Sequence, residues 1–441
     1  MKFYNRNKEL HKLQSLREAS FNDHSRLTVV TGRRRIGKTS LIIHDTGTMP
    51  MLYFFVGRKN EAALCAGFCR EIEAKLGLQT PKMSTFEEVF VYLLQIGRTQ
   101  KFTLIIDEFQ EFANINPSIY SDLQNHWDQM RLTTHINLIV SGSIYSMMNK
   151  IFQDGKEPLF GRADAYIRLT PFSTDVVKEI LNDYNPNYCN DDLLALYTVT
   201  GGVAKYIELL MDNGATTVDK IIEAVCDLDS PMRDEGRNIL IEEFGKNYGT
   251  YFSILDAISS GRNTQAEIEA ALGNKSLGGQ LAKLEDTFEV IAKMRPIFAK
   301  PGSQTVRYYI KDQFFDFWFR YFEGNRQLIE MGLSDALKRT IKADYTTYSG
   351  KVLEKYFKQK LRESGEYREI GSYWESKPGK EQREVDIVAI SIDKKHALVA
   401  EVKRQSKEFS PESFSVKVEH LRTKILTNYD IEEKLFSLND M

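Results

Sequence analysis

The stretch Gly32-Arg-Arg-Arg-Ile-Gly-Lys-Thr39 limits what this chain can fold into more than any other part of the sequence. It follows the apolar, β-branched run 26–31, which is typical of a buried parallel strand, and it precedes the run 40–44, which suits the first turns of a helix. Glycines let the backbone pass close to a phosphate group, and the start of a helix offers unpaired N–H groups. The pattern predicts a phosphate-binding loop in an α/β fold with a parallel central sheet. A tight turn without a ligand is the alternative.

The residue types in this loop indicate a nucleoside triphosphate and a magnesium ion. Lys38 is expected to reach the β- and γ-phosphates of ATP, and the Thr39 hydroxyl is expected to ligate Mg²⁺. The candidate nucleotide-binding residues of the loop are Gly32, Arg35, Gly37, Lys38, Thr39 and Ser40. Residues 3–16 repeat leucine at three-residue spacing and predict an amphipathic helix. This helix either lies beside the adenine or only packs against the rest of the domain.

The apolar run 51–56 predicts a second buried strand, and a further apolar strand pattern, 102–108, ends in the two carboxylates Asp107 and Glu108 and resembles a Walker B motif. Asp107 is expected to hold Mg²⁺ through water, and Glu108 is expected to polarise the attacking water as a general base. The apolar run 136–141 ends in small polar residues, so Ser141 or Ser143 is a candidate sensor of the γ-phosphate. An ordinary strand-to-loop turn at these serines is the alternative.

Arg162 is a candidate for the cation that stabilises transition-state charge during hydrolysis. It would act either on the nucleotide of its own subunit or on that of a neighbouring subunit, and the second case would make the chain a homo-oligomer. An exposed arginine without such a role is the alternative.

Composition and charge exclude several classes of protein. The 441 residues carry a formal net charge of −2, so no overall positive field draws the chain to nucleic acid, and a DNA-binding surface has to be a local patch. No apolar run approaches the ~18 residues that indicate a membrane span, and the N-terminus lacks the apolar core of a signal peptide. The four cysteines are expected to be buried thiols. We therefore expect a cytoplasmic protein with no membrane partner.

The middle of the chain predicts a helical segment and then a different small unit. Residues 173–245 are helical and poor in strands. Residues 246–322 predict three helices and two strands around a turn at Pro301, which is the order of a winged helix. The third helix carries Glu285 and Asp286, and acidic side chains read the major groove poorly. A structural or protein-contact role is therefore favoured over base-specific DNA reading.

The last segment contains Asp386, Glu401 and Lys403 in the pattern D-x14-E-x-K, which is similar to that of restriction-endonuclease-like nucleases of the PD-D/E-x-K type. Strands are predicted near 368–374, 383–392 and 396–403. If residues 393–394 form a two-residue hairpin turn, Asp386 falls directly opposite Glu401, with their Cβ atoms about 5 Å apart. Lys403 points to the same face and would hold a scissile phosphate or activate water. Such a carboxylate pair repels unless a cation lies between its members, and oxygen ligands suit Mg²⁺ or Mn²⁺.

The same resemblance implies that a helical glutamate, Glu354, completes the metal shell. The candidate metal ligands of the whole chain are Thr39, Asp107, Glu354, Asp386 and Glu401, and the candidate catalytic residues are Glu108, Arg162 and Lys403. A solvated, charge-alternating hairpin and a degenerate nuclease fold are the alternatives to an active nuclease site.

Four stretches together resemble the archaeal/bacterial ATPase family of the STAND-related AAA+ P-loop group. They are residues 3–10, 32–40, 106–109 and 309–320. The resemblance implies ATP binding, a winged helix that the last stretch closes, and a C-terminal nuclease-like domain. The chain departs from the family at Ala204, where members usually carry proline after paired glycines, so the resemblance does not extend to nucleotide contact by this element.

We therefore predict a P-loop NTPase domain (1–172), a helical lid (173–245), a winged helix (246–322), a helical linker (323–345) and an α/β restriction-endonuclease-like domain (346–441). The leading function is an ATP-driven switch that controls a nuclease acting on DNA or RNA. The main alternative is an ATP-dependent regulator whose inactive nuclease fold binds partners or DNA, and metal dependence separates the two. A transcription regulator is a third interpretation, which the acidic third helix disfavours.

Overall fold

The computed structural model describes residues 1–46, 50–300, 302–303, 305–375 and 383–441. The chain divides into two compact units, one formed by Phe3–Thr170 and the other by Met1–Lys2 together with Pro171–Met441. Over the described residues, no helix has the length and apolar character that crossing a membrane requires.

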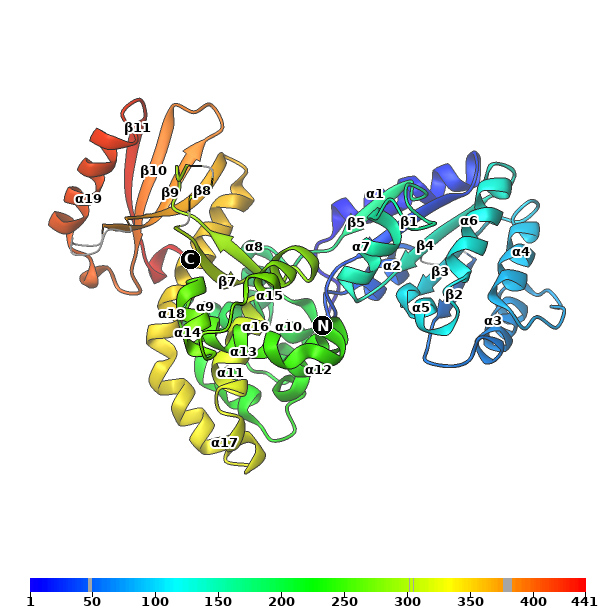
Figure 1. Ribbon diagram of the computed structural model, residues 1–441, viewed down its shortest axis with the longest axis horizontal. Helices are drawn as coiled ribbons and strands as arrows, with labels where there is room; N and C mark the ends of the chain where they lie inside the picture. The colour runs from blue at the N-terminus through cyan, green and yellow to red at the C-terminus, as the bar shows by residue number, and fades with distance from the viewer. Residues whose placement is uncertain (47–49, 301, 304, 376–382) are drawn as a thin grey trace. The chain divides into compact units, whose positions relative to one another are not determined.

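The first unit is built on a parallel sheet with the strand order β2-β3-β4-β1-β5 (Figure 1). Its strands are β1 (Arg26–Thr31), β2 (Met51–Phe55), β3 (Phe102–Asp107), β4 (Ile136–Ser141) and β5 (Ala165–Arg168). β3 and β4 are buried along their whole length, as central strands of a parallel sheet covered on both faces should be. Because neighbouring strands run parallel, the carboxyl ends of β1, β3 and β4 meet at one edge of the sheet.

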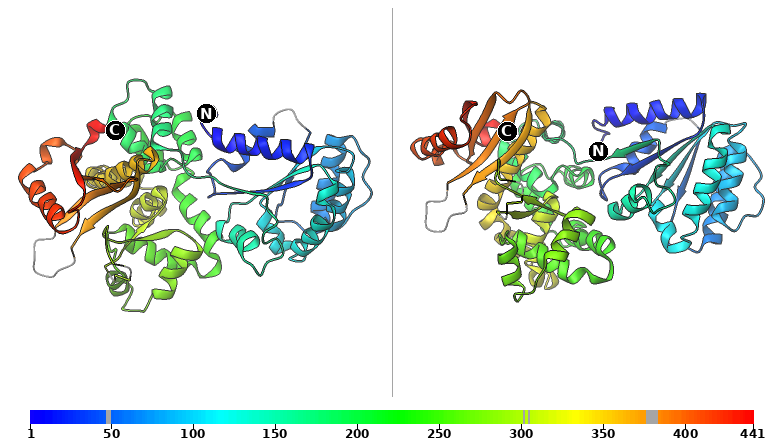
Figure 2. Two further views of the ribbon diagram at one scale, coloured as in Figure 1. Left: turned by 90° about the horizontal axis from the view of Figure 1, so that it is seen from above. Right: turned by 45° about the horizontal axis from the view of Figure 1, so that its top comes forward.

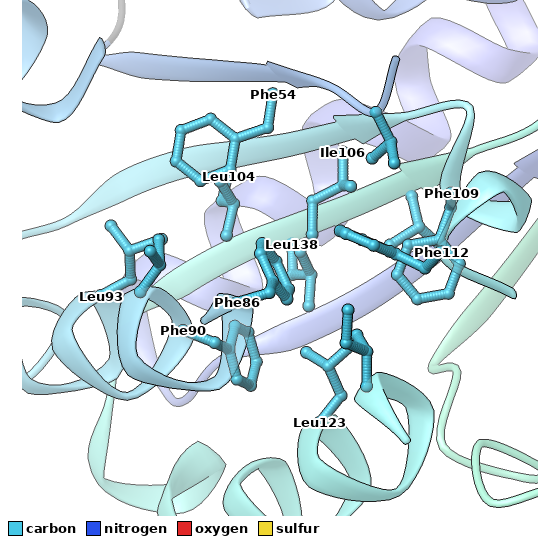
Figure 3. Packing of buried hydrophobic residues seen from close by; sticks show 14 of the residues in the cluster. Phe54, Phe86, Phe90, Leu93, Leu104, Ile106, Phe109, Phe112, Leu123 and Leu138 are labelled. Carbon is cyan, nitrogen blue, oxygen red and sulfur yellow. The ribbon is translucent and has the colours of Figure 1, made fainter. Parts of the chain in front are cut away.

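Helices cover both faces of this sheet (Figure 2). They are α1 (Asn7–Asn22), α2 (Lys38–Thr46), α3 (Glu61–Leu76), α4 (Phe86–Ile96), α5 (Phe112–Ile115), α6 (Ile119–Met130) and α7 (Tyr145–Gln153). On one face, Phe86 and Phe90 of α4 and Leu123 of α6 pack toward Phe54 and Leu104 of the strands (Figure 3). This apolar layer holds in place the strands whose ends carry the polar residues of the first site.

The second unit begins with a helical part. Its helices are α8 (Thr174–Tyr184), α9 (Asn190–Thr200), α10 (Ala204–Asp212), α11 (Val218–Cys226) and α12 (Met232–Phe244). Then α13 (Tyr248–Ser259), α14 (Gln265–Ala271) and α15 (Gly278–Ala282) precede an antiparallel hairpin of β6 (Ile291–Met294) and β7 (Arg307–Ile310). The order of helices and strands is the one predicted for residues 246–322, and their identity as a winged helix stays a prediction. Pro301, the predicted turn, lies outside the described residues.

One long helix connects the hairpin region with the end of the chain. After α16 (Gln313–Trp318) and α17 (Arg326–Glu330), α18 (Ser334–Ser364) continues for 31 residues. Its buried residues recur every three or four positions and include Leu337, Ile341, Tyr345, Tyr348, Val352 and Tyr356. Because this apolar stripe is continuous, α18 joins the predicted linker to the predicted nuclease-like domain instead of ending between them.

The second unit ends in a sheet with the order β11-β10-β9-β8. β8 (Tyr367–Trp374), β9 (Glu384–Ser391) and β10 (His396–Val402) are antiparallel neighbours, whereas β11 (Asp430–Phe436) follows helix α19 (Pro411–Lys424) and pairs with β10 in parallel. Phe414, Val418 and Leu421 of α19 pack on this sheet. The sequence analysis places β8, β9 and β10 but misses β11, because β11 is a largely exposed edge strand that lacks an apolar face.

The loop between β6 and β7 is anchored on this end sheet. The N–H of Ile297 donates a hydrogen bond to the carbonyl of Ser372 in β8 at 2.8 Å, and the Ile297 side chain belongs to the core of the sheet. Arg307 of β7 forms an ion pair with Glu384 of β9 at 2.7 Å and lies over the ring of Trp374. The hairpin and the end sheet therefore share one packed interior.

Candidate nucleotide and metal sites

The phosphate-binding loop lies between β1 and α2, and its backbone requires glycine. Gly32 and Gly37 have φ angles of 146° and 97°, which L side chains rarely adopt. A Cβ at Gly32 would also lie 2.9 Å from the carbonyl oxygen of Leu169. Arg35 adopts a φ of 71°, so a residue other than glycine also takes a left-handed conformation in this loop.

Lys38, the first residue of α2, turns back into the loop. Its Nζ donates hydrogen bonds to the carbonyl oxygens of Gly32 at 2.8 Å and Arg33 at 3.2 Å. Burial lowers the pKa of Lys38 to about 8, against the opposing effect of the negative charges on Glu108 and Asp107. The loop backbone therefore wraps around a desolvated cation, which is the arrangement that binding of a triphosphate needs.

Asp107, at the end of β3, accepts hydrogen bonds on both of its carboxylate oxygens. Oδ2 accepts from the hydroxyls of Thr39 at 3.0 Å and Tyr53 at 2.6 Å, and Oδ1 accepts from the Ser141 hydroxyl at 2.6 Å. The structure thus brings together Thr39, Asp107 and Ser141, which the sequence analysis places at one site. Tyr53 was missed, because its strand is identifiable only as an apolar run, and its contact with Asp107 depends on β2 lying beside β3.

Glu108 follows in a left-handed conformation, with a φ of 55°. Its Oε2 accepts hydrogen bonds from the Gln110 amide at 2.6 Å and from the Ser143 hydroxyl at 2.7 Å. Each of the two candidate serines therefore contacts one of the two carboxylates, Ser141 contacting Asp107 and Ser143 contacting Glu108. Sequence reasoning missed Gln110, and the role of Glu108 as general base stays a prediction.

Arg162 does not lie at the carboxyl edge of the sheet. It precedes β5 near Asp164, whose N–H donates to the carbonyl of Leu27 at the start of β1, and it forms an ion pair with Asp128 at 3.1 Å. Because the phosphate-binding loop follows the other end of β1, the predicted action of Arg162 on the nucleotide of its own subunit is corrected. Action on a neighbouring subunit stays a prediction.

Arg168 near the carboxyl edge, and helix α1, bear on the earlier predictions. Arg168, the last residue of β5, is paired in register with Thr31 at the end of β1 and lies over the ring of Tyr145 at 4.4 Å. Sequence reasoning missed this cation, because only the position of β5 beside β1 brings it to the loop. Helix α1 buries Leu13 and Leu16, and its contact with adenine stays a prediction.

The second candidate site lies where β9 and β10 stop pairing. The observed register, with Ala400 opposite Ile387, places Asp386 opposite Glu401 when it is continued by one residue, as predicted. The turn is longer than the predicted two residues, because the strands end at Ser391 and resume at His396. The register is nevertheless the predicted one, because the loop adds the same number of residues on both sides of the turn.

Burial and like charge dominate the electrostatics of this second site. Burial raises the pKa of Glu354 to about 7. The negative charges of Asp386 and Glu384 also raise this pKa, whereas the positive charges of Lys358 and Lys403 lower it. Burial also raises the pKa of Asp386, and the negative charge of Glu401 contributes. The structure therefore brings Asp386 close enough to interact electrostatically with Glu354 and with Glu401.

Lysines form ion pairs with two of these carboxylates, Glu401 and Glu354. Glu401, which is 4% exposed, has Lys417 Nζ at 2.5 Å from Oε1 and Lys403 Nζ at 3.1 Å from Oε2. Lys358 Nζ lies 3.8 Å from a carboxylate oxygen of Glu354. Sequence reasoning missed Lys358 and Lys417, because they project from helices α18 and α19 and their direction depends on how these helices pack.

These lysines change the argument for a metal. Within the described ranges, no group of three or more His, Cys, Asp or Glu side chains is arranged so that it could hold a metal ion. The repulsion between Asp386 and Glu401 calls for a cation, and the ammonium groups of Lys403 and Lys417 beside Glu401 already supply positive charge, so a bound metal between the two carboxylates stays a prediction. The oxygen donors are of the right kind for Mg²⁺ or Mn²⁺, but the lysines would have to make room for the ion.

Comparison with known proteins identifies both parts of the chain. Residues 3–210 match a family described as an ATPase domain predominantly from Archaea, and residues 318–413 match a family of archaeal and bacterial proteins of unknown function. The uncharacterized protein MJECL04 of Methanocaldococcus jannaschii is 30% identical over 401 residues, which are 89% of this chain and 86% of the relative. The chain belongs to this archaeal ATPase family. It is a P-loop ATPase whose C-terminal segment forms a separate sheet.

Solved structures share the fold of this P-loop ATPase. The Walker-type ATPase PABY2304 of Pyrococcus abyssi has a TM-score of 0.55 at 18% identity and covers 72% of this chain and 96% of its own. The ORC2 protein of Aeropyrum pernix, in its ADPNP–ADP complexes, has a TM-score of 0.50 at 15% identity, with 78% and 96% covered. At such identities the likeness concerns the α/β fold of the ATPase, and the nuclease-like identity of the last domain stays a prediction.

The paired glycines Gly201 and Gly202 form a tight turn before Ala204. Gly202 has a φ of 82°, and its carbonyl accepts a hydrogen bond from the N–H of Phe172 at 2.8 Å. A Cβ at Gly202 would lie 2.6 Å from the carbonyl oxygen of Phe172, and a Cβ at Gly201 would lie 2.8 Å from Cβ of Gln313. Packing within the second unit explains these glycines without any contact to nucleotide.

Proposed function

We propose that this P-loop ATPase is a switch in which ATP binding and hydrolysis control a metal-dependent, nuclease-like domain that acts on nucleic acid. The register of β9 and β10 carries the proposal, because it sets Asp386 opposite Glu401 at the point where the strands stop pairing. Lys403 follows two residues later and lies 3.1 Å from Glu401. Two carboxylates and a lysine at one strand end are the minimum set for orienting a phosphodiester and a water molecule.

In the ATPase unit, we assign nucleotide binding to the loop residues Gly32, Arg35, Gly37, Lys38, Thr39 and Ser40. Mg²⁺ would be held by Thr39 of α2 and, through water, by Asp107 of β3. The Thr39 hydroxyl oxygen lies 3.0 Å from Oδ2 of Asp107. The ion would supply positive charge at the developing phosphate charge. Glu108 would accept the proton of the attacking water once it is released from Gln110 and Ser143.

Contacts inside the second unit favour a connection between the lid and the end domain. Gln313 lies against Gly201 and accepts a hydrogen bond from Lys355 of α18 at 3.1 Å. Lys355 lies one residue from Glu354 on the same helix. Arg404, next to Lys403, forms two hydrogen bonds of 2.8 Å with Asp191 of α9. A shift of the lid would therefore displace residues that adjoin the carboxylates.

A second candidate function is an ATP-dependent regulator whose nuclease fold is inactive and serves to bind partners or DNA. The neutralising lysines around Glu401 favour this candidate, because paired charges are stable without metal.

The hairpin of β6 and β7 is poorly suited to bind DNA. The anchoring of Ile297 on β8 opposes insertion of the hairpin loop into a nucleic-acid groove. The ion pair of Lys293 with Glu285 at 2.5 Å further reduces the positive charge available there.

Metal-dependent cleavage separates the two candidates. The full chain is incubated with Mg²⁺ or Mn²⁺ and with plasmid, single-stranded DNA or RNA, with and without ATP. We expect cleavage by the parent chain, none by Asp386→Ala, and slower cleavage by Lys403→Ala, because lysine contacts phosphate or water and not the ion. Glu369→Ala, at an exposed position of β8, is the matched control. Absence of cleavage in every metal and nucleotide condition would leave the regulator as the function.

A further inference from the structure

Four hydrogen-bond donors converge on the carboxylate of Asp107. Its Oδ2 accepts from the hydroxyl of Thr39 in α2 at 3.0 Å and from the hydroxyl of Tyr53 in β2 at 2.6 Å. Its Oδ1 accepts from the Ser141 hydroxyl at the end of β4 at 2.6 Å and from the backbone N–H of Glu108 at 3.0 Å. Hydrogen bonds therefore fix the direction of both oxygens, and one of these bonds ties that direction to the backbone of the next residue.

Rotamer preference alone would not hold this carboxylate. The torsion about the Cβ–Cγ bond of an aspartate is broad, so the donors around the carboxylate set its direction. The bond from Tyr53 is short and its acceptor is a carboxylate, which places it among the stronger hydrogen bonds of a protein. Thr39 is the other donor to the same oxygen, and its bond is longer. Of the two donors to Oδ2, Tyr53 therefore restricts the carboxylate more.

Tyr53 lies outside both sequence motifs of the nucleotide site. It is a partly buried residue in the middle of β2 and pairs in register with Ile105 of β3, two residues before Asp107. The Lys38 ammonium group is held separately, by carbonyl oxygens of the phosphate-binding loop. Loss of the Tyr53 hydroxyl would therefore remove a support of Asp107 and leave the hydrogen bonds of Lys38 in place.

The direction of the Asp107 carboxylate matters for the residue that follows it. Glu108 has a φ of 55°, a conformation that residues other than glycine rarely adopt, and Oδ1 of Asp107 holds its N–H. If the carboxylate turns because Oδ2 has lost a donor, Oδ1 moves as well, and the N–H of Glu108 loses its partner. A change at Tyr53 in β2 thus reaches Glu108 through Asp107.

We infer that Tyr53 is a positioning residue for ATP hydrolysis, which acts through Asp107 and holds the Asp107–Glu108 pair in the orientation that hydrolysis requires. The inference concerns the ATPase unit alone, and it rests on the roles proposed above for Asp107 and Glu108. Because the loop and Lys38 keep their hydrogen bonds without it, the Tyr53 hydroxyl governs the rate of hydrolysis and not the affinity for nucleotide.

The test compares Tyr53→Phe with the parent chain, because phenylalanine keeps the ring in β2 and removes only the hydroxyl. The rate of ATP hydrolysis in Mg²⁺, in single turnover with the chain in excess, should fall about tenfold, the lower end of the range for loss of a group that orients a metal ligand. The affinity for a non-hydrolysable ATP analogue, measured by calorimetric titration, should not change. Tyr92→Phe in α4 is the matched control, since it removes a hydroxyl that bonds to the Gln79 carbonyl at 3.1 Å.

A second comparison separates positioning from a general effect on the strand. Asp107→Ala should itself slow hydrolysis, and Tyr53→Phe should add no further loss in that background, because no carboxylate is left to orient. Two variants that act independently would instead multiply their effects on the rate.

The outcomes distinguish the role of Tyr53 from that of Asp107. If Tyr53→Phe hydrolyses ATP at the parent rate while Asp107→Ala is slow, the role of Tyr53 is overturned and that of Asp107 stands. The role of Tyr53 is likewise overturned if Tyr53→Phe slows Asp107→Ala as much as it slows the parent, or if it weakens binding of the analogue as much as it slows hydrolysis. If Asp107→Ala hydrolyses ATP as fast as the parent, the proposed role of Asp107 fails together with this inference.

Discussion

Lys38 is the cation on which the chemistry of the phosphate-binding loop depends. Burial lowers its pKa to about 8, and the carbonyls of Gly32 and Arg33 hold the ammonium group inside the loop. Phosphate groups favour the charged form of a neighbouring lysine. Nucleotide binding should therefore take up a proton wherever the free loop has lost one.

The first prediction concerns Lys38 and pH. ATP affinity of the parent chain should fall as the pH rises from 7 to 9, because Lys38 loses its proton near pH 8 and must regain it to bind phosphate. Lys38→Ala should bind at least tenfold more weakly at pH 7, since charge-assisted hydrogen bonds are worth about 1.5–3 kcal/mol each. It should also lose this pH dependence. Calorimetric titration checks both effects with Lys75→Ala as control, and equal affinity in Lys38→Ala would contradict the assignment.

A second residue-scale prediction concerns Glu354. Its pKa is raised from 4.5 to about 7, so between these pH values the folded chain holds a proton that the unfolded chain has lost. The free energy of unfolding should therefore decrease as the pH rises through this window. Glu354→Gln has no proton to lose and should be more stable than the parent at pH 8, by less than the full pKa shift implies, because the Glu354 side chain is 34% exposed and water screens its charge.

Urea unfolding at pH 5 and pH 8 measures this difference. Glu366→Gln, an exposed carboxylate at the start of the end sheet, is the control and should show no pH-dependent gain. A Glu354→Gln variant whose stability relative to the parent is the same at both pH values would show that Glu354 is not buried in this way.

Individual site residues were predictable where the sequence ties them to a strand end or a loop. Lys38, Thr39 and Asp107 follow from motifs whose spacing also dictates their backbone. Tyr53 and Lys417 were not predictable, because their contacts arise between elements that are distant in the chain. A tyrosine in an apolar strand and a lysine on an amphipathic helix carry no signal of their own until the packing is known.

Strand register was more predictable than strand order. The pairing of β9 with β10 follows from the position of the turn, and it holds although the loop is longer than expected. The order β2-β3-β4-β1-β5 is not encoded in any local pattern, and it places β5, which follows Arg162 in the chain, beside β1. The length of α18 was likewise missed, because charged residues on its exposed face conceal a continuous buried stripe.

The element-scale prediction concerns Arg162. Arg162 lies before β5, and we predict that it acts on the nucleotide bound to a neighbouring subunit. Turnover per chain should therefore rise with protein concentration. Arg162→Ala should slow hydrolysis at least tenfold with little change in ATP affinity, because the cation acts on transition-state charge. Steady-state hydrolysis over a range of concentrations checks this, with the exposed Arg98→Ala as control. Undiminished turnover in a monomeric chain would leave Arg162 as part of the ion pair with Asp128 only.

At the scale of the whole molecule, an ATPase unit and a carboxylate–lysine site lie in separate compact units of one chain. Between them in sequence stands the turn of Gly201 and Gly202, which is held to Phe172 at the beginning of the second unit. The proposed switch requires that the state of the nucleotide alters the end domain through this turn and α18. Neither site alone establishes that coupling.

The most direct measurement is the rate of nucleic-acid cleavage in Mn²⁺ with and without ATP, compared between the parent chain and variants of each site. We predict that ATP changes the rate in the parent, that Lys38→Ala loses the response, and that Glu108→Gln, which binds ATP without hydrolysing it, stays in the ATP-dependent state. Asp386→Ala should cleave in no condition. A parent chain that cleaves at the same rate with and without ATP, or an Asp386→Ala variant that cleaves as the parent does, would contradict the proposed switch.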